Sequence, residues 1–285
     1  MKAPKTVLIT GANGFVGRAT AGALAEAGWR VTRGVRSCGL SSSGDSARLD
    51  LSQPETVLAL AKKTRFDAVV HLGALVGLSG DCPADMFVPN VLSTGCLCYL
   101  ARGWGARLLF ASTAIVHGVR TESIDADSPI IPDTAYANSK WLAEQLLAAS
   151  QERHCVLRMA GVFGADGPGH LGLNRAISGA VQGVAPTRVG SGRALRNYLY
   201  VKDVAEAISF ALREELEGTH LLAGDEVLSV ADMLQELCSV FTPDQLVQVE
   251  EGGEASDQVI RPSSLLPKTR PFREALLDIR KDGRR

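Results

Sequence analysis

The sequence lacks the features that mark several large classes of protein. Its 285 residues carry 30 lysines and arginines against 31 aspartates and glutamates, a formal net charge of -1, so no excess of positive charge indicates a surface for nucleic acid or an anionic membrane. The longest apolar stretch, residues 68–78, is interrupted by His71 and two glycines and is shorter than the roughly 18 residues of a membrane-spanning helix. The apolar run at residues 6–10 leads into glycines rather than a signal-peptide cleavage site. We therefore expect a cytoplasmic protein that binds neither nucleic acid nor membranes.

Cysteine pairs and metal-binding clusters are also missing. The sequence contains no C-x-x-C pair, and no histidines stand at the spacing of metal ligands. A disulfide scaffold and a zinc site are therefore both unexpected, and we predict no metal site. We expect buried or half-buried free thiols at the six cysteines, which are Cys38, Cys82, Cys96, Cys98, Cys155 and Cys238.

What the sequence does contain is an alternation of short apolar runs with longer stretches of helical character. Hydrophobic residues make up 46% and charged residues 21% of the chain, values typical of a globular protein. The expected buried strands are residues 6–10, 68–72, 107–112 and 155–159, and the expected helices are residues 15–27, 54–63, 86–102 and 135–152. Strands that alternate with helices are typical of a parallel sheet covered on both faces. We therefore predict an α/β protein with a doubly wound parallel sheet, followed after Gly164 by a second, smaller region.

A glycine-rich segment stands between the first expected strand and the first expected helix. Its residues are Gly11-Ala12-Asn13-Gly14-Phe15-Val16-Gly17. Glycine lets the backbone pass close to a pyrophosphate, and the free amides and the dipole of a helix N-terminus favour a bound anion. The spacing is G-x-x-G-x-x-G rather than the G-x-G-x-x-G of the best-known dinucleotide fingerprint. The motif by itself therefore leaves both a nucleotide site and a plain tight turn open.

The end of the second expected strand carries arginines. An enzyme that uses NAD commonly has an acidic residue here, which hydrogen-bonds the ribose hydroxyls, but residues 30–37 contain none. Arg33 and Arg36 can instead pair with a 2′-phosphate, which favours NADP over NAD; the alternative is that one or both are solvated surface charges. Asp50 can accept a hydrogen bond from an adenine amino group, although a lone aspartate more often caps a helix.

Tyr136 and Lys140 lie four residues apart in an expected helix, so the phenol and the ammonium share one face. A nearby ammonium stabilises a phenolate and is expected to lower the tyrosine pKa from about 10, which suits a general acid or base near neutral pH. Thr113, after an expected strand, would supply a hydroxyl that holds the reacting oxygen. A tyrosine and a lysine at this spacing also occur by chance in many helices, so this interpretation depends on the glycine-rich segment as well.

Together these motifs resemble one family, the extended short-chain dehydrogenase/reductases, and within it the nucleotide-sugar epimerase and dehydratase group. The resemblance covers nearly the whole chain. Its landmarks occur in the family order at residues 10–17, 50–51, 71–74, 90–91, 112–113, 136–140, 158–164 and 196–204. The resemblance implies a Rossmann-type dinucleotide-binding domain over residues 1–163, to which residues 197–212 return. A smaller C-terminal substrate-binding region would comprise residues 164–196 and 213–285.

The resemblance also implies the residues of the site. Tyr136 would be the catalytic acid or base, Lys140 would bind the nicotinamide ribose, and Thr113, in place of the more usual serine, would lie beside the substrate oxygen. The implied cofactor-binding residues are Gly11, Asn13, Gly14, Phe15, Val16, Gly17, Arg36, Asp50, Leu51, Leu72, Gly73, Ala74, Asn90, Tyr136 and Lys140. Arg196 and Arg261 match positions that clamp the diphosphate of a nucleotide sugar, although either can also be part of a surface salt bridge.

Three departures from the family pattern narrow the reaction. Dehydratases of the family carry an Asp-Glu pair directly after the threonine, where this chain has Ala114 and Ile115, so we do not expect dehydration. His117 replaces the family tyrosine, and a core or capping role is more frequent for such a histidine than contact with substrate. Gly161 stands where many relatives have a substrate-contacting asparagine, which puts the usual sugar or phosphate contact in doubt.

These implications define the expected function. We predict an NAD(P)-dependent 4-epimerase or 4-ketoreductase of a nucleotide-activated sugar, with NADP favoured over NAD, in which Thr113, Tyr136 and Lys140 assist hydride transfer. One alternative is an NADPH-dependent reductase of a small carbonyl compound without a nucleotide, and another is a non-catalytic dinucleotide sensor. The resemblance further suggests a homodimer built on the helices around residues 86–102 and 135–152.

Overall fold

The computed structural model describes residues 4–36, 46–62, 64–77, 83–150 and 153–283. The chain divides into two units, of which the first comprises residues 1–119, 129–158 and 204–220 and the second comprises residues 120–128, 159–203 and 221–285. These bounds differ from the expected ones in three places, the first of which is that residues 159–163 belong to the second unit. Residues 120–128 belong to the second unit because their strand β6 (Ser123–Ile124) pairs with β15 (Val259–Ile260). The returning segment is residues 204–220 rather than 197–212, because it includes most of the helix α7 (Val201–Arg213) and the start of the strand that follows it.

The central sheet has seven strands. They are β1 (Thr6–Thr10), β2 (Arg30–Val35), β3 (Ser46–Arg48), β4 (Ala68–His71), β5 (Arg107–Thr113), β7 (His154–Met159) and β12 (Gly218–Leu222). The order across the sheet is β12-β7-β5-β4-β1-β2-β3, and β1 pairs in parallel with both β2 and β4. The chain order reverses between β1 and β4, and such a switch point opens a crevice at the carboxyl ends of the strands. The predicted α/β fold with a doubly wound, mostly parallel sheet is confirmed.

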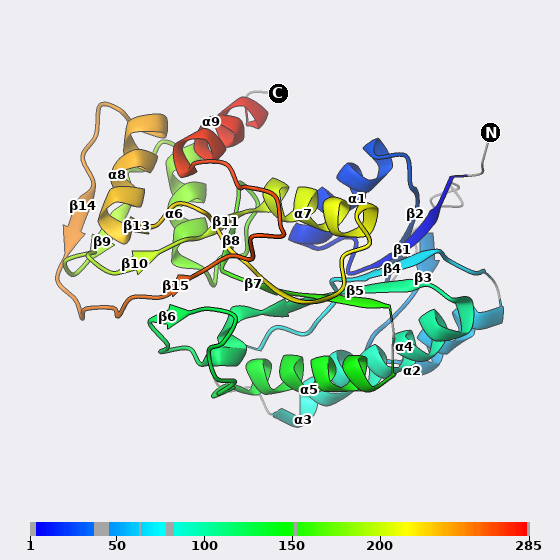
Figure 1. Cartoon of the computed structure of the whole chain (residues 1–285). Coiled ribbons are helices and arrows are strands. Elements are labelled where there is room, and N and C mark those ends of the chain that lie inside the picture. The colour runs from blue at the N-terminus through cyan, green and yellow to red at the C-terminus, as the bar shows by residue number, and fades with distance from the viewer. Residues whose placement is uncertain (1–3, 37–45, 63, 78–82, 151–152, 284–285) are drawn as a thin grey trace. The chain divides into compact units, whose positions relative to one another are not determined.

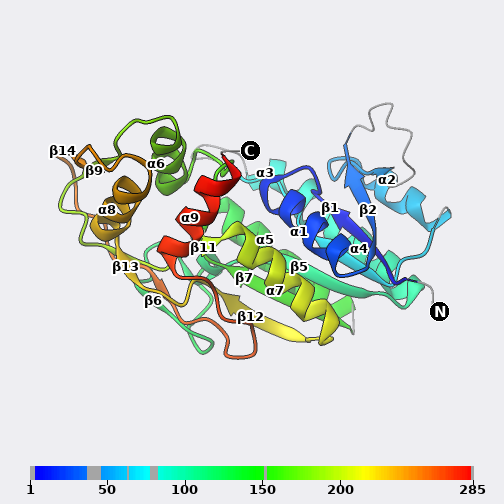
Figure 2. The same ribbon diagram turned by 90° about the horizontal axis from the view of Figure 1, so that it is seen from above.

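Helices cover both faces of this sheet. α1 (Phe15–Glu26) and α7 lie on one face, and α2 (Pro54–Leu58), α4 (Ser93–Trp104) and α5 (Ala135–Ser150) lie on the other (Figure 1). Figure 2 looks down on the face that α1 and α7 cover. Between the layers, strand side chains such as Leu8, Val69 and Phe110 are fully shielded from solvent. Coverage on both faces explains why these strands have continuous apolar sequences.

Two of the expected helices are interrupted. In residues 54–63, α2 ends at Leu58 and continues as a 3₁₀ turn, η1 (Ala59–Lys62). In residues 86–102, a short α3 (Pro83–Met86) is followed by the π-helical η2 (Phe87–Leu92) before α4 begins. Pro89 lies within η2 and has no N–H to donate to an α-helical ladder, which favours the wider π-type turn. Among the helices of the described residues, none is long and apolar enough to cross a membrane.

The second unit combines helices with short strand pairings. Its main helices are α6 (Gly172–Val181), α8 (Val230–Phe241) and α9 (Phe272–Asp282). Besides β6 and β15, its strands are β8 (Val162–Phe163), β9 (Thr187–Val189), β10 (Leu195–Arg196), β11 (Leu199–Tyr200), β13 (Leu228–Ser229) and β14 (Gln248–Glu250). They pair two by two, β10 with β13, β11 with β8, and β14 with β9. This unit therefore presents loops and short strand ends rather than one large sheet.

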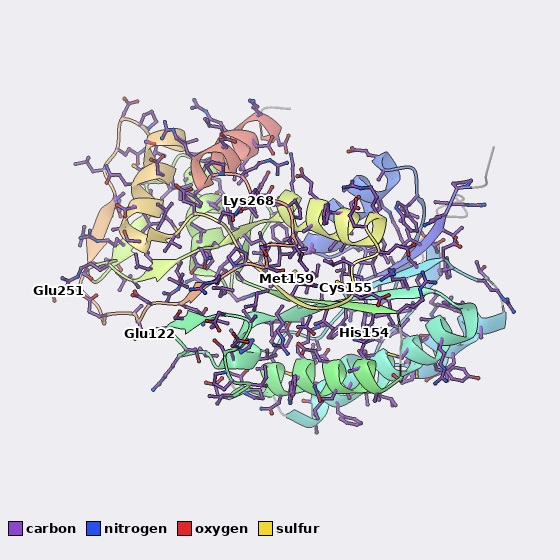
Figure 3. All side chains as sticks on the ribbon, in the orientation of Figure 1. Glu122, His154, Cys155, Met159, Glu251 and Lys268 are labelled. Atoms are coloured by element: carbon purple, nitrogen blue, oxygen red, sulfur yellow. The ribbon has the colours of Figure 1, made fainter. Side chains whose placement is uncertain are left out.

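The described cysteines are free thiols. They are Cys96, Cys98, Cys155 and Cys238, of which the first is half-buried and the others are buried. Burial raises the pKa of Cys98 to about 11 and that of Cys155, labelled on β7 in Figure 3, to about 12, so both are unreactive at neutral pH. The expectation of buried or half-buried thiols is confirmed for these four, while Cys38 and Cys82 lie outside the described residues.

Candidate active site

The glycine-rich segment forms a tight turn between β1 and α1. Gly11 has a left-handed backbone with φ of 66°, and a Cβ there would lie 2.7 Å from the Cα of Gly73, just after β4. A Cβ on Gly17 would lie 2.1 Å from the carbonyl oxygen of Gly11. Side chains are therefore excluded from both positions, and the backbone of the turn is bare at Gly11 and Gly14. α1 begins after Gly14, which has no side chain to cap the first helical amides, so these amides are available to an anion.

A cavity of about 530 Å³ lies at this turn, next to the switch point of the sheet. Its described lining residues are Gly11, Asn13, Gly14, Gly34, Val35, Arg36, Leu49, Asp50, Leu51, Ser52, Leu72, Gly73, Ala74, Leu75 and Pro89. The cavity thus brings together nine of the fifteen predicted cofactor-binding residues. The six that are not among its described lining are Phe15, Val16, Gly17, Asn90, Tyr136 and Lys140. The bare turn, the uncapped amides and the volume fit a dinucleotide.

The structure separates the charged residues that were predicted near this cavity. Arg36 follows β2 directly and lines the cavity, whereas Arg33 is exposed on β2 and is not among the described lining residues. Asp50 lines the cavity, and its Oδ1 also accepts a hydrogen bond from the amide of Ser52 at 2.9 Å. Asp50 therefore stabilises the local turn before α2 and also lines the cavity.

The first turns of α5 carry Tyr136 and Lys140. Lys140 is buried, and its Nζ lies 4.3 Å from the ring centroid of Phe110 on β5 and 6.0 Å from the ring centroid of Tyr136. The two side chains share one face of the helix, as their spacing predicts. The amine therefore lies against two aromatic rings rather than in water.

The expected lowering of the Tyr136 pKa is wrong for the structure described. Burial raises the pKa of Tyr136 to about 12, because a phenolate here would be poorly solvated. Burial also lowers the pKa of Lys140 to about 7, although the negative charge of Glu144 opposes this shift. The amine therefore carries only part of a positive charge near neutral pH, and the loss of solvation outweighs its attraction for a phenolate. Tyr136 consequently holds its proton at neutral pH.

Thr113 ends β5 and begins the 3₁₀ turn η3 (Ala114–His117). Its half-buried side chain accepts a hydrogen bond from the amide of Ile115 at 3.4 Å, a long and weak contact. The threonine hydroxyl proton is not used in this contact. Neither Ala114 nor Ile115 carries an acidic or basic group, so the end of β5 offers a hydroxyl but no carboxylate pair.

A buried ion-pair network lies one turn further along α5. The Glu144 carboxylate accepts from Arg158 on β7: Nη2 lies 2.7 Å from Oε2, and Nε lies 3.2 Å from each of the two oxygens. Ser112 donates its hydroxyl to the same carboxylate. Arg158 Nη1 also donates to Nε2 of His117 at 3.1 Å, and His117 Nδ1 donates to the carbonyl oxygen of Pro129 at 3.0 Å. The core role favoured for His117 is thus confirmed.

Glu144 and Arg158, which form the ion pair of this network, were not predicted as site residues. Glu144 follows Lys140 by four residues, and this spacing places both on one face of α5. Arg158 belongs to the landmark at residues 158–164 but was given no role. The helical spacing could have identified Glu144, whereas the pairing with Arg158 depends on how β7 and α5 pack.

The lowered pKa of Lys140 makes a prediction about stability. An unfolded lysine stays protonated up to its ordinary pKa of 10.5, whereas the buried amine loses its proton near pH 7. Between these values the unfolded state binds more protons than the folded state, so the free energy of unfolding rises with pH. Relative to a Lys140→Met variant, we expect the wild type to gain about 1 to 3 kcal/mol between about pH 7 and about pH 9. Urea unfolding of both proteins measures this gain, and parallel pH dependences would contradict it.

The predicted substrate arginines lie in the second unit. Arg196 stands on β10, forms an isolated β-bridge with Gln258, and donates from Nη1 to the carbonyl oxygen of Ser256 at 2.7 Å. Arg261 follows β15 directly, is exposed, and donates its amide to the carbonyl oxygen of Ile124 at 2.8 Å. Both arginines therefore flank the same short strand, β15.

A second cavity, of about 450 Å³, lies within the second unit. The described residues that line it are mainly apolar; they are Gly172, Leu173, Arg175, Ala176, Gly179, Val184, Ala185, Pro186, Thr187, Val189, Tyr198, Val230, Met233 and Leu234.

The structure explains the glycine at position 161, because a Cβ on Gly161 would lie 2.8 Å from Cδ1 of Tyr198. The tyrosine ring therefore occupies the space that a side chain at position 161 would need, which accounts for the glycine at this position.

The chain is similar in sequence to known epimerases. Residues 7–224 match the model of a family described as "NAD dependent epimerase/dehydratase family". UDP-glucose 4-epimerase 4 of Oryza sativa subsp. japonica is 30% identical over 257 residues, which cover 75% of this chain and 69% of that protein. UDP-glucose 4-epimerase of Bacillus subtilis (strain 168) is 27% identical over 256 residues, which cover 75% of this chain and 74% of that protein.

Solved structures share the fold at lower identity. UDP-N-acetylglucosamine 4-epimerase from Bacillus cereus aligns with a TM-score of 0.84 and 21% identity, covering 99% of this chain and 100% of that one. UDP-glucuronic acid 4-epimerase from Bacillus cereus, solved in complex with NAD, aligns with a TM-score of 0.80 and 18% identity, covering 98% and 100%. These similarities confirm the Rossmann-type fold.

Proposed function

Because the chain belongs to the NAD dependent epimerase/dehydratase family, the extended short-chain dehydrogenase/reductase group, we propose that it is an NAD(P)-dependent 4-epimerase or 4-ketoreductase of a nucleotide-activated sugar. One observation carries the proposal. The first unit holds the bare glycine turn and its cavity together with Thr113, Tyr136 and Lys140. The two sequence relatives described above are UDP-glucose 4-epimerases, which supports a nucleotide sugar as the substrate class.

Each residue of the first unit has a proposed role. The dinucleotide would be held at Gly11 and Gly14, with its pyrophosphate on the uncapped amides of α1. When bound, it supplies the hydride acceptor or donor. Tyr136 holds its proton at neutral pH, so its phenol is suited to donate that proton to a carbonyl oxygen during reduction and to take it back during oxidation. Thr113 would orient the same oxygen through its hydroxyl, and Lys140 would hold the nicotinamide ribose.

The chain is further proposed to prefer NADP to NAD. Arg36 supports this preference because it lines the cavity directly after β2, where a 2′-phosphate needs a cation. An Arg36→Ala variant is expected to bind NADPH about ten- to a hundredfold more weakly, with little change for NADH. Arg33→Ala is the matched control, since Arg33 is an equally exposed arginine on β2 that is not among the described residues lining the cavity. Fluorescence titration measures both Kd values, and an equal loss for the two cofactors would contradict the preference.

The substrate class is tested by Arg196→Ala, with the exposed Arg193 as a matched alanine control. We expect Arg196→Ala to raise KM for a UDP-hexose by about tenfold or more and to leave KM for a small ketone unchanged. A wild type that reduces small ketones but converts no nucleotide sugar would instead support the carbonyl-reductase alternative. The cofactor that co-purifies separates the two proposed reactions, because retained NAD⁺ indicates an epimerase and exchangeable NADPH a reductase.

A homodimer built on α4 and α5 is also proposed. The two helices pack closely, since a Cβ on Gly95 would lie 2.9 Å from Cδ2 of Leu146. Exposed apolar side chains lie at Tyr99 on α4, at Leu142 on α5 and at Leu92, which ends η2 just before α4. Tyr99 is 72% exposed, so its replacement by glutamate changes this surface without disturbing the core. Sedimentation equilibrium should give the mass of two chains for the wild type and of one chain for Tyr99→Glu; a monomeric wild type would refute the dimer.

A further inference from the structure

His71, at the end of β4, is a buried histidine with no role in the function proposed above. Its ring is fully shielded from solvent and lies against Phe110, with ring centroids 5.4 Å apart. Nδ1 lies 2.7 Å from Oγ1 of Thr10, and Nε2 lies 2.9 Å from Oγ1 of Thr94. Burial, and secondly the charge of Lys140, lowers the pKa of His71 to about 3, so the ring is neutral at neutral pH.

The hydrogen bonds around the ring determine its tautomer. Thr94 donates its hydroxyl proton to the carbonyl oxygen of Asn90 at 2.7 Å, so its oxygen can only accept from His71. The single proton of the neutral ring therefore lies on Nε2, and Nδ1 is an acceptor. Thr10 must then donate its hydroxyl proton to Nδ1, while its oxygen accepts from the amide of Gly73 at 3.1 Å. These bonds use both ring nitrogens and both threonine protons.

Asn90, in η2, continues this connection to α5. Its Nδ2 donates to Oγ of Ser139 at 2.9 Å, and its side chain is fixed by two further bonds, to the amide of Leu75 at 2.7 Å and to the carbonyl oxygen of Leu75 at 2.9 Å. Ser139 in turn donates to the carbonyl oxygen of Tyr136 at 2.8 Å. The path that leads from His71 towards α5 therefore ends on the backbone carbonyl of Tyr136.

The opposite end of the path lies at the cavity of the first unit. Gly73 lines that cavity and stands directly against Gly11 of the glycine turn, with no side chain between the two backbones. The amide of Gly73 is the first donor of the path. A buried network in which each group is satisfied has few alternative arrangements, so it transmits position between its ends.

We propose that His71 is a positioning residue, which in its Nε2-protonated form ties the wall of the dinucleotide cavity at Gly73 to the first turn of α5 and so holds Tyr136 in place for proton transfer. The expected effect on turnover rests on the proposed function, whereas the hydrogen-bonded path itself does not. First turns of helices fray unless they are held, and a misplacement of about 1 Å can cost about a hundredfold in rate.

Thr94→Val tests the path because it removes the hydroxyl between His71 and Asn90 with almost no change in shape. We expect kcat to fall about tenfold and the dinucleotide Kd to change by about twofold at most, because Gly73, Thr10 and His71 remain linked. Thr94→Ser, which restores the hydroxyl, should recover kcat to within about twofold. The matched control is Thr20→Val, since Thr20 is equally buried in α1 and donates to Val16 one turn earlier, at 2.9 Å.

Ser139→Ala breaks the same path one step later, between Asn90 and Tyr136. If both groups act through one path, the double variant Thr94→Val/Ser139→Ala loses no more turnover than the more affected single variant. If the two substitutions instead cause independent structural defects, their fold-losses in turnover multiply in the double variant. A multiplicative loss, or equal kcat values for Thr94→Val and Thr20→Val, overturns the proposal.

Two further measurements do not depend on turnover. Hydrogen exchange of the amides in the first turns of α5 should be faster in Thr94→Val than in Thr20→Val or the wild type. Nitrogen NMR of the wild type should show His71 neutral with its proton on Nε2. If both results hold and the wild type converts no nucleotide sugar, the proposed function fails while the path stands. Unchanged exchange, or a proton on Nδ1, overturns the path whatever the activity.

Discussion

Replacing Tyr136 by phenylalanine is expected to lower kcat by about a thousandfold on whichever substrate the wild type converts. The variant keeps the ring whose centroid lies 6.0 Å from Nζ of Lys140 but removes the oxygen that carries the proton. Neither Ala114 nor Ile115, beyond the end of β5, offers a side chain that can take over proton transfer. Steady-state kinetics measures the loss.

Dinucleotide binding provides the control for this variant. Tyr136 is not among the described residues that line the cavity at the glycine turn, so the Kd for the dinucleotide should change by no more than about threefold. Tyr99→Phe, on the exposed surface of α4, removes the same hydroxyl elsewhere in the first unit and should leave kcat unchanged. A Tyr136→Phe enzyme that keeps a tenth or more of its turnover would exclude the phenol as the acid or base.

Replacing Glu144 by glutamine is expected to lower the free energy of unfolding by about 3 to 5 kcal/mol. The carboxylate is 4% exposed and its partner Arg158 is 11% exposed, with 2.7 Å between the nearest nitrogen and oxygen. In the variant the guanidinium of Arg158 stays buried without a counter-charge. Leaving a buried charge unpaired is what makes the loss of one partner of a buried ion pair so destabilising. The pKa of Lys140 should fall further as well, because the charge of Glu144 now raises it.

An exposed ion pair supplies the matched comparison. Glu236 and Arg273 pair on the surface of the second unit, with side chains 37% and 54% exposed. Glu236→Gln should cost about 1 kcal/mol or less, because water solvates both groups. Urea unfolding followed by circular dichroism measures both variants. Equal losses for Glu144→Gln and Glu236→Gln would show that burial of the first pair has no energetic consequence.

The elements that depend on local sequence were predictable. The four expected strands occur within one residue of their predicted bounds at each end, as in β1, because continuous apolar runs are buried wherever a sheet is covered on both faces. The turn at Gly11 was predictable for a similar reason, since glycines between a strand and a helix indicate a backbone that must come close to a ligand. The nine predicted residues that line the cavity follow from strand ends meeting at one edge of the sheet.

The helix expected over residues 86–102 shows where local reasoning ends. Its composition is helical, but Pro89 cannot donate to the ladder and Asn90 is held by Leu75 and Ser139. The chain therefore adopts a π-helical turn that presents Asn90 to α5. Tertiary hydrogen bonds stabilise this conformation, and composition alone gives no sign of them.

The sequence alone determined the α/β architecture, the glycine turn and the spacing that puts Tyr136 and Lys140 on one helix face, because each depends on residues close together in the chain. Only the tertiary structure decided the protonation of that pair. Burial raises the pKa of Tyr136 and lowers the pKa of Lys140, and these shifts outweigh the opposite ones expected from the attraction between a phenolate and an ammonium. It also decided the two buried networks around α5. Their members come from separate strands and helices, and hydrogen bonds between such residues exist only once packing has excluded water from all of them.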